Sequence, residues 1–399
     1  MLTIGLIREG KHPADNRVSI TPAQAKWIHQ HMPAIKIIVQ SSDKRCFTDK
    51  EYSLQGITVK EDMQDADVLL GIKEVPVDML VENKTYLFFS HTKKLQPNNQ
   101  GLFKAIIKKK ITLVDFECLV HEDGQRVLGF GFFAGIVGAH NGMMAYGKRT
   151  GTIQLGRVHA NRDYRHLIHT YFGLKLPNIK IAVTGSGRVA HGVLEVMNLM
   201  GVNEVDHDEY LERNFSYPVY VHLKGNDLYT HQEKKTYKRD HFHEHPAEYR
   251  SRFLPFTHCS DILMNGVYWE ENIPRLFELS DIDETFSIGT IADITDDEQG
   301  SIPINLGDQD MEHPVYGVDK TTKEKTAPYL PNSIDIMAVG NLPNELPRDA
   351  SQYFGEQLIK YVLDDIIKGE SDMLEKATIV KKGVITLPFK YMEEYGGVL

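Results

Sequence analysis

The sequence predicts an α/β protein with two domains, each built on a mostly parallel sheet. In the first 140 residues, short apolar segments alternate with helical ones, the pattern that parallel strands and crossover helices produce. A second alternating series begins at Ile179–Thr184, after a helical stretch rich in glycine and alanine at Phe133–Lys148. With 399 residues, the chain also exceeds the size at which a single hydrophobic core stops growing.

Composition and charge exclude several classes of protein. A hydrophobic content of 41% is that of an ordinary globular protein, and no run of 18 apolar residues predicts a membrane helix. The net charge of -10 argues against nucleic acid as the main partner. The three cysteines are far apart, and the amino terminus has the pattern of a strand rather than a signal peptide, so we expect reduced thiols and a cytoplasmic location.

Seven segments make up the predicted first domain. Thr21 is a suitable N-cap and Pro22 suits the first position of the helix that follows. A second helix is predicted from Pro97 to about Lys109. The predicted strands are Thr3–Ile7, Ile35–Val39, Ala66–Ile72, Thr85–Ser90 and Ile111–Phe116.

A glycine turn follows the strand Ile179–Thr184 and leads into an apolar-periodic helix at Val193–Met200. Glycine lets the backbone approach a pyrophosphate, and the amides at the start of the helix stabilise its charge. Between a strand and a helix, this pattern predicts a dinucleotide site in a Rossmann-like domain. The residues of the turn are Gly185, Ser186, Gly187, Arg188 and Val189.

Further buried strands are predicted at Asp261–Met264, Thr290–Ile294 and Asp335–Val339. The polar stretch 209–252 is interpreted as an insertion beside the nucleotide site rather than core. A helix over 350–368 and the tail that follows it are expected to return to the first domain. We therefore expect residues 141–344 to form the dinucleotide-binding Rossmann domain. Residues 1–140 with 345–399 should form a Rossmann-like substrate domain, and the two parallel sheets should flank an interdomain cleft.

Ionisable residues follow four predicted strands of the first domain: Arg8, Glu9, Lys73, Glu74, His91 and Glu117. Strands often end in charged residues simply because they end in solvent. Ligands of parallel sheets, however, bind at the carboxyl ends of the strands, so a set that includes an amine, an imidazole and carboxylates favours a site. Such a set suits oxidation at a carbon that bears nitrogen, in which a nicotinamide moves the hydride and the protein moves protons.

Two arginines and two glutamates complete the predicted substrate site. Arg17 and Arg126 offer guanidinium groups suited to substrate carboxylates. Glu74 and Glu117 suit a substrate ammonium group. The sequence therefore predicts a small amino-acid substrate.

These residues lie in segments that resemble the alanine dehydrogenase and transhydrogenase superfamily, within it the saccharopine dehydrogenase (lysine-forming) and lysine-ketoglutarate reductase branch. The resemblance covers nearly the whole chain. The matching segments include Ile7-Arg8-Glu9, Gly71-Ile72-Lys73-Glu74, Ser90-His91-Thr92, Leu113 to Glu117, Gly129-Phe130-Gly131, His245-Pro246, Leu263 to Trp269, Ile291 to Ile294 and Asn341-Leu342-Pro343.

The resemblance implies NAD(P)-dependent interconversion of saccharopine with L-lysine and 2-oxoglutarate, with Lys73 and His91 as the acid–base pair. It also implies that Arg17, Glu74, Lys94, Glu117 and Arg126 surround the substrate, although Lys93 competes with Lys94 for that place. Asn265, Gly266 and Leu342 are implied as cofactor-binding residues. One departure is Gly340, which stands where many relatives have Asp before the Asn-Leu-Pro motif.

The choice of cofactor depends on acidic residues about 20 positions after the glycine turn. Asp206 and Asp208 stand there, and an acidic side chain can bind the ribose hydroxyl of NAD and repel the extra phosphate of NADP. We expect NAD bound through Asp208, with NADP possible because Arg188 could accept the phosphate. The spacing of His241, His243, Glu244 and His245 fits no common metal motif, so no metal is expected.

Two alternatives to saccharopine chemistry remain at this point. One is another amino-acid or opine-type dehydrogenase, such as an alanine dehydrogenase. The other is a catalytically silent NAD-binding regulator, which Gly340 makes conceivable. As partners we expect a small-molecule substrate but neither nucleic acid nor membrane, with the chain a monomer or a small homo-oligomer.

Overall fold

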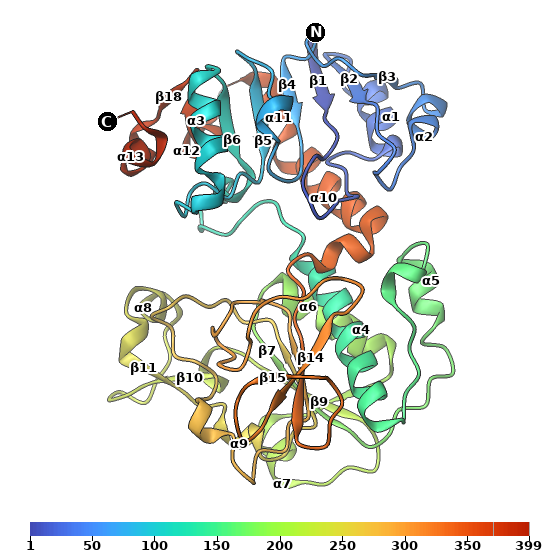
Figure 1. Cartoon of the computed structure of the whole chain (residues 1–399), viewed down its shortest axis with the longest axis vertical. Coiled ribbons are helices and arrows are strands. Elements are labelled where there is room, and N and C mark those ends of the chain that lie inside the picture. The colour runs from blue at the N-terminus through green and yellow to red at the C-terminus, as the bar shows by residue number, and fades with distance from the viewer. Residues whose placement is uncertain (370, 399) are drawn as a thin grey trace. The chain divides into compact units, whose positions relative to one another are not determined.

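A computed structural model describes residues 1–369 and 371–398, which form two compact units (Figure 1). The first unit contains Met1–Phe130 and the described residues from Pro347 onward, and the second contains Gly131–Leu346. The division falls at the start of helix α4 (Gly131–Thr150). That helix therefore lies wholly in the second unit, whereas the boundary expected at residue 140 would have cut through it.

The first unit is built on an eight-stranded sheet. The strands from β3 to β6 are parallel, as expected, whereas β17 runs antiparallel to β6 and β18 antiparallel to β17. In sheet order the strands are β18 (Val384–Ile385), β17 (Thr378–Lys381), β6 (Thr112–Asp115), β5 (Thr85–Phe88), β4 (Val68–Leu70), β1 (Leu2–Leu6), β2 (Ile35–Gln40) and β3 (Thr58–Lys60).

Seven α-helices within the described residues belong to the same unit as this sheet. The first, α1 (Pro22–His31), has Thr21 as its N-cap: the Thr21 hydroxyl accepts the amide of Gln24, and the Gln24 side chain accepts the amide of Thr21 at 2.9 Å. This reciprocal pair confirms the expected helix start. The other helices are α2 (Asp49–Leu54), α3 (Gln100–Lys108), α10 (Pro347–Tyr361), α11 (Leu363–Lys368), α12 (Asp372–Ala377) and α13 (Glu393–Gly396).

The second unit holds another eight-stranded sheet, parallel at its centre, with β14 antiparallel to β16 and to β15. The α/β fold with two largely parallel sheets is thus confirmed. In sheet order the strands are β15 (Lys325–Thr326), β14 (Val315–Asp319), β16 (Ser333–Met337), β13 (Thr290–Asp293), β12 (Ile262–Asn265), β7 (Lys180–Thr184), β9 (Val219–Leu223) and β8 (Asn203–Glu204).

The stretch 209–252 differs from its interpretation as an insertion. Its segment Val219–Leu223 is strand β9, which is largely buried and pairs along its whole length with β7. After β9, a two-stranded antiparallel pair packs with a short helix, and Tyr229, Phe242 and Tyr249 of these elements belong to the hydrophobic core. These elements are β10 (Tyr229–His231), α8 (Arg239–Glu244) and β11 (Tyr249–Ser251).

Helices α4 and α6 (Arg188–Leu199) of the second unit pack closely because each has a glycine at their contact. A Cβ atom on Gly135 of α4 would collide with the carbonyl oxygen of Val189, and one on Gly192 of α6 would collide with that of Phe132. Close packing of this kind fixes the start of α6 against α4. The remaining helices are α5 (Tyr164–His169), α7 (His207–Glu212) and α9 (Leu254–Thr257). No helix within the described residues has the length and apolarity that crossing a membrane demands.

Candidate functional site

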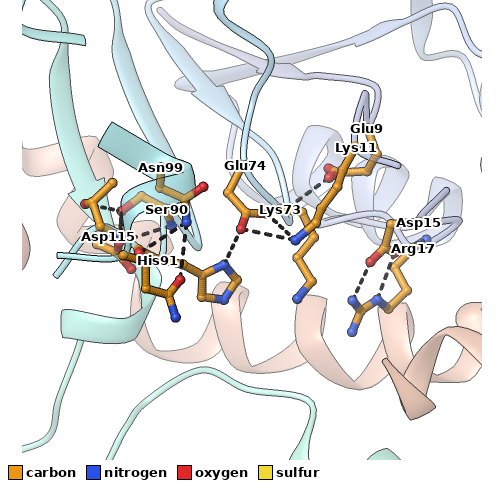
Figure 2. Close-up of polar contacts among 12 residues, drawn as sticks. Glu9, Lys11, Asp15, Arg17, Lys73, Glu74, Ser90, His91, Asn99 and Asp115 are labelled. Atoms are coloured by element: carbon orange, nitrogen blue, oxygen red, sulfur yellow. Dashed lines mark hydrogen bonds and ion pairs between the residues drawn. The ribbon is translucent and has the colours of Figure 1, made fainter. Parts of the chain in front are cut away.

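Strands β1, β4, β5 and β6 are parallel neighbours, so their carboxyl ends lie at one edge of the first sheet. Four of the ionisable residues predicted from the strand ends are seen together there, namely Glu9, Lys73, Glu74 and His91 (Figure 2). In Figure 2 the side chains of Lys73, His91 and Arg17 extend toward the same side.

Glu74 is the centre of a short polar chain. Its Oε1 lies 2.7 Å from Nδ1 of His91, and its Oε2 accepts the Lys11 amine at 2.9 Å. Burial alone would raise the pKa of Glu74, but the hydrogen bonds and charges of His91 and Lys11 outweigh it and lower the pKa to about 2. The carboxylate is therefore ionised and fixes the orientation of the imidazole. The His91 backbone has φ of 49°, and its carbonyl accepts the Asn99 side-chain amide at 3.3 Å.

Lys73 projects into the same region and is mostly buried. Burial, together with the charges of Arg17 and Lys11, lowers its pKa to about 8, although Asp15 and Glu74 oppose the shift. An amine with this pKa exists in both protonation states near neutral pH. It therefore has the property that a general base or acid requires.

Arg17 is buried beside Lys73 and is held by an acidic partner. Its Nε donates to Asp15 Oδ1 at 2.9 Å, a second nitrogen pairs with Asp15 Oδ2, and its guanidinium lies 4.1 Å from the centroid of the Phe130 ring. The ion pair and the ring fix the orientation of the guanidinium. No sequence pattern indicated Lys11 or Asp15, which lie in a loop without periodicity.

Glu117 and Arg126 contact each other. They form an ion pair in which the Glu117 side chain is mostly buried and the Arg126 side chain is 49% exposed. The backbone amide of Glu117 donates to Asp115 at 2.7 Å, so the buried end of β6 sets its position. Lys94 and Lys93 are both exposed, on the segment after His91. Burial raises the pKa of Cys118 to about 12, which agrees with an inert thiol.

The glycine turn of the second unit has the geometry that a phosphate site needs. Gly185 has φ of 106°, and a Cβ there would collide with the carbonyl oxygen of Gly266. Gly187 is the N-cap of α6 and has open space where a side chain would stand. Ser186 lies between them, and Arg188 and Val189 begin the helix. The backbone amides at this end can thus reach a pyrophosphate, which fits the expected nucleotide.

Two other implied cofactor residues lie in the protein interior. Asn265 is fully buried, donates to Asp293 and Ser301 at 2.8 Å each, and accepts the Thr184 hydroxyl at 2.7 Å. Its side chain therefore ties together the ends of β7, β12 and β13. Leu342 is likewise buried.

Asp208 is not at the glycine turn. It lies on α7, is 78% exposed, and has His207 at 3.2 Å. The reason is the strand order, because β8 pairs with β9 and not with β7. The end of β9 instead contacts the turn: Leu223 O accepts the Gly185 amide at 3.0 Å, and His222 Nε2 donates to Gly185 O at 2.7 Å.

Two histidines and a glutamate near β10 and β11 resemble a metal site, but the ring nitrogen that would bind the metal carries a proton. Nitrogen and oxygen atoms of His231, His241 and Glu248 lie within 4.8 Å of one another. However, His231 Nδ1 accepts the backbone amides of Glu233 and Lys234, so its proton sits on Nε2 and donates to Glu248 at 3.0 Å. A metal at Nε2 would require a doubly deprotonated ring. The hydrogen bonds account for this cluster without a metal.

Comparison with known proteins adds sequence and fold relatives. Residues 5–137 match the family model described as alanine dehydrogenase/PNT, N-terminal domain. Mouse mitochondrial alpha-aminoadipic semialdehyde synthase is 29% identical over 98% of this chain and 47% of its own length. A saccharopine dehydrogenase [NAD(+), L-lysine-forming] of Yarrowia lipolytica is 22% identical over 90% of both chains.

By these matches the chain is similar to the alanine dehydrogenase/transhydrogenase superfamily and, within it, to the saccharopine dehydrogenase branch. It spans about half the length of the mammalian relatives it matches. A solved L-alanine dehydrogenase has the same fold, with a TM-score of 0.64 at 16% identity, and covers 100% of this chain. A transhydrogenase from Sinorhizobium meliloti has a TM-score of 0.57 at 12% identity.

The glycine at position 340 has a local explanation. A Cβ atom there would lie 3.0 Å from Oδ2 of Asp308 and 3.4 Å from Oδ2 of Asp296. Burial, together with Asp293 and Asp308, raises the pKa of Asp296 to about 7. A further carboxylate at position 340 would therefore meet two others, and the Asp308 carboxylate already lies beside this position.

Proposed function

We propose that this chain is an NAD(P)-dependent dehydrogenase that interconverts saccharopine with L-lysine and 2-oxoglutarate. The observation that supports it most is the set of Lys73, Glu74 and His91 at one sheet edge, in a chain whose second unit has a phosphate-binding glycine turn. The names of the relatives supply the substrate. A nicotinamide, when bound, exchanges the hydride, and the residues of the first unit transfer the protons.

The proposed proton transfers follow from the charges at the site. In the oxidative direction, neutral Lys73 accepts a proton from the protonated secondary amine of the substrate. The neutral amine that results would become an iminium when its carbon gives a hydride to the bound nicotinamide. His91, oriented by Glu74, removes a proton from the water that attacks this carbon. Lys73 returns its proton to the nitrogen of the carbinolamine, the carbon–nitrogen bond breaks, and the hydroxyl proton passes to solvent as lysine and 2-oxoglutarate are released. Arg17 stabilises a substrate carboxylate by charge.

The direct test is the oxidation of reduced cofactor by the whole chain with lysine plus 2-oxoglutarate, compared with pyruvate plus ammonia. Turnover with the first pair alone supports the proposal. Turnover with pyruvate and ammonia instead would identify an alanine dehydrogenase. Cofactor binding without turnover on either pair would indicate a regulator.

The pH dependence of oxidation tests the role of Lys73. Its ordinary pKa of 10.5 is lowered to about 8, and only the neutral amine can accept a proton. We therefore expect kcat/KM for saccharopine to rise with pH and to level off above about 8. A profile that is flat between pH 6 and 10, measured at saturating cofactor, would contradict this role.

We further propose that the cofactor's adenosine ribose lies at the end of β9, not at Asp208. Lys224 directly follows β9, and both Lys224 and His191 act on the half-buried ring of His222. A cationic strand end favours the extra phosphate of NADP over the hydroxyl of NAD.

Lys224→Glu is expected to weaken NADPH binding about tenfold or more, as measured by nicotinamide fluorescence titration, while NADH binding changes little. Asp208→Asn is the matched control because it removes an exposed charge one strand farther away, and both affinities should stay at the wild-type level. Loss of NADH affinity in Asp208→Asn would restore the assignment made from the sequence.

A further inference from the structure

The Glu9 carboxyl group bridges two backbone amides next to the proposed base. Its Oε1 accepts the amide of Ile72 at 2.7 Å, and its Oε2 accepts the amide of Lys73 at 2.8 Å. Glu9 lies just beyond β1, and these two residues lie just beyond β4, the neighbour of β1. The carboxyl group thus continues the contact between the two strands after the last backbone hydrogen bond, from Ile7 to Leu70.

The two hydrogen bonds that Glu9 accepts hold the backbone from which the side chains of Lys73 and Glu74 extend. Lys73 and Glu74 are consecutive, so a shift of the turn after β4 would move the amine and the partner of His91 together. The turn is also tightly packed, because a Cβ on Gly71 would lie 3.1 Å from the Ile7 side chain. The Glu9 side chain is only partly exposed, and each of its carboxyl oxygens accepts one of the two amides.

Charged side chains surround both the Glu9 carboxyl group and the Lys73 amine. Asp15 and Arg17 act on the Glu9 carboxyl group, and the Lys73 amine has Arg17, Lys11, Asp15 and Glu74 around it. Burial and Asp15 raise the pKa of Glu9 to about 8, against the effect of the two amides and Arg17. In the structure each Glu9 oxygen accepts one backbone amide, and these two hydrogen bonds oppose the effect of burial on the pKa.

We propose that Glu9 is the positioning residue for Lys73: its side chain, held by the amides of Ile72 and Lys73, fixes the turn that carries the amine. Its catalytic part rests on the proposed function. The contact itself and its effect on the amine do not depend on which substrate the chain uses.

The test uses Glu9→Gln in the whole chain. A glutamine oxygen can accept only one of the two amides, and its NH₂ group would face the other donor. We expect kcat with lysine plus 2-oxoglutarate to fall by about tenfold to a hundredfold, with cofactor affinity unchanged. Glu61→Gln is the matched control, because it removes the same charge from an exposed carboxylate that pairs with Arg8 near the same edge, and should change neither value.

A second readout does not require turnover. Acetic anhydride labelling of Lys73 at a series of pH values, read by peptide mass spectrometry, reports the protonation of the amine. A displaced turn moves the amine relative to Arg17, Lys11, Asp15 and Glu74, so the labelling midpoint should shift by about half a pH unit or more in Glu9→Gln relative to Glu61→Gln. This shift identifies the positioning role even if lysine and 2-oxoglutarate are not the substrates.

Two outcomes would overturn the inference. One is a Glu9→Gln variant whose labelling midpoint equals that of the control, since a merely structural role would lower stability and kcat without moving the midpoint. The other comes from Glu9→Asp, which keeps the charge but is too short to span both amides. Wild-type kcat in that variant would show that the bridge is not needed, and this result stands even if Glu9→Gln fails to fold.

Discussion

Lys73→Met is expected to lower kcat with lysine plus 2-oxoglutarate by about a thousandfold or more. Methionine has nearly the same length and suits a buried site, but it cannot accept or release a proton. The amine lies among Arg17, Lys11, Asp15 and Glu74. Its loss removes an unfavourable buried cation, so the variant should fold and should bind the reduced cofactor with wild-type affinity. Steady-state kinetics and a fluorescence titration on one preparation measure both quantities.

The control for this experiment is Lys84→Met. Lys84 precedes β5, at the opposite end of the strand that leads to His91, and its amine donates to the carbonyl of Gln64. The same substitution there should leave kcat within about twofold of the wild type, because the site is at the other edge of the sheet. Equal activity of both variants would remove Lys73 from the mechanism.

Alanine should have different effects on stability at two glycines of α6, its N-cap Gly187 and the interior Gly192. At Gly192 a Cβ would collide with the carbonyl oxygen of Phe132, so α6 and α4 must separate. We expect Gly192→Ala to lower the free energy of unfolding by about 3 kcal/mol, seen as a lower Tm in thermal unfolding. At Gly187 the same methyl group meets open space in the structure, so stability should be retained.

The matched variant Gly187→Ala should instead impair cofactor binding. Its methyl group would occupy the space that a pyrophosphate needs at the start of α6, and a loss of affinity of about tenfold or more is expected. A Gly192→Ala protein with unchanged Tm would show that the α4–α6 contact can relax. Unchanged nucleotide affinity in Gly187→Ala would place the phosphates elsewhere.

Much of the candidate site follows from one rule, that ligands of parallel sheets lie at the carboxyl ends of the strands. The rule selected Lys73, Glu74 and His91, and the structure brings Glu74 within 2.7 Å of His91. It could not find Lys11 and Asp15, because they lie in the loop between β1 and α1, where no periodicity indicates which side chains turn inward. Their contribution is electrostatic and emerges only when the loop folds over the sheet edge.

The strand order of the second sheet could not be predicted for a different reason. Local patterns indicate strands but not their neighbours. Asp208 was chosen because the strand after the glycine turn and its helix usually lies beside the first strand. Here that strand, β8, has only two residues and pairs with β9 instead. Strand β9 was not predicted within 209–252, because its short apolar segment Val219–Leu223 is surrounded by polar residues.

The pairing of β17 with β6 has a consequence for synthesis of the chain. As the polypeptide leaves the ribosome, Gly131–Leu346 is complete in one continuous segment and can begin to fold at once. The sheet that carries Lys73 must wait with the edge of β6 open until Thr378–Lys381 has been translated. The unit that contains Met1–Phe130 is therefore completed after the unit Gly131–Leu346. During that interval the unpaired edge of β6 is open to pairing with other strands, which chaperones prevent.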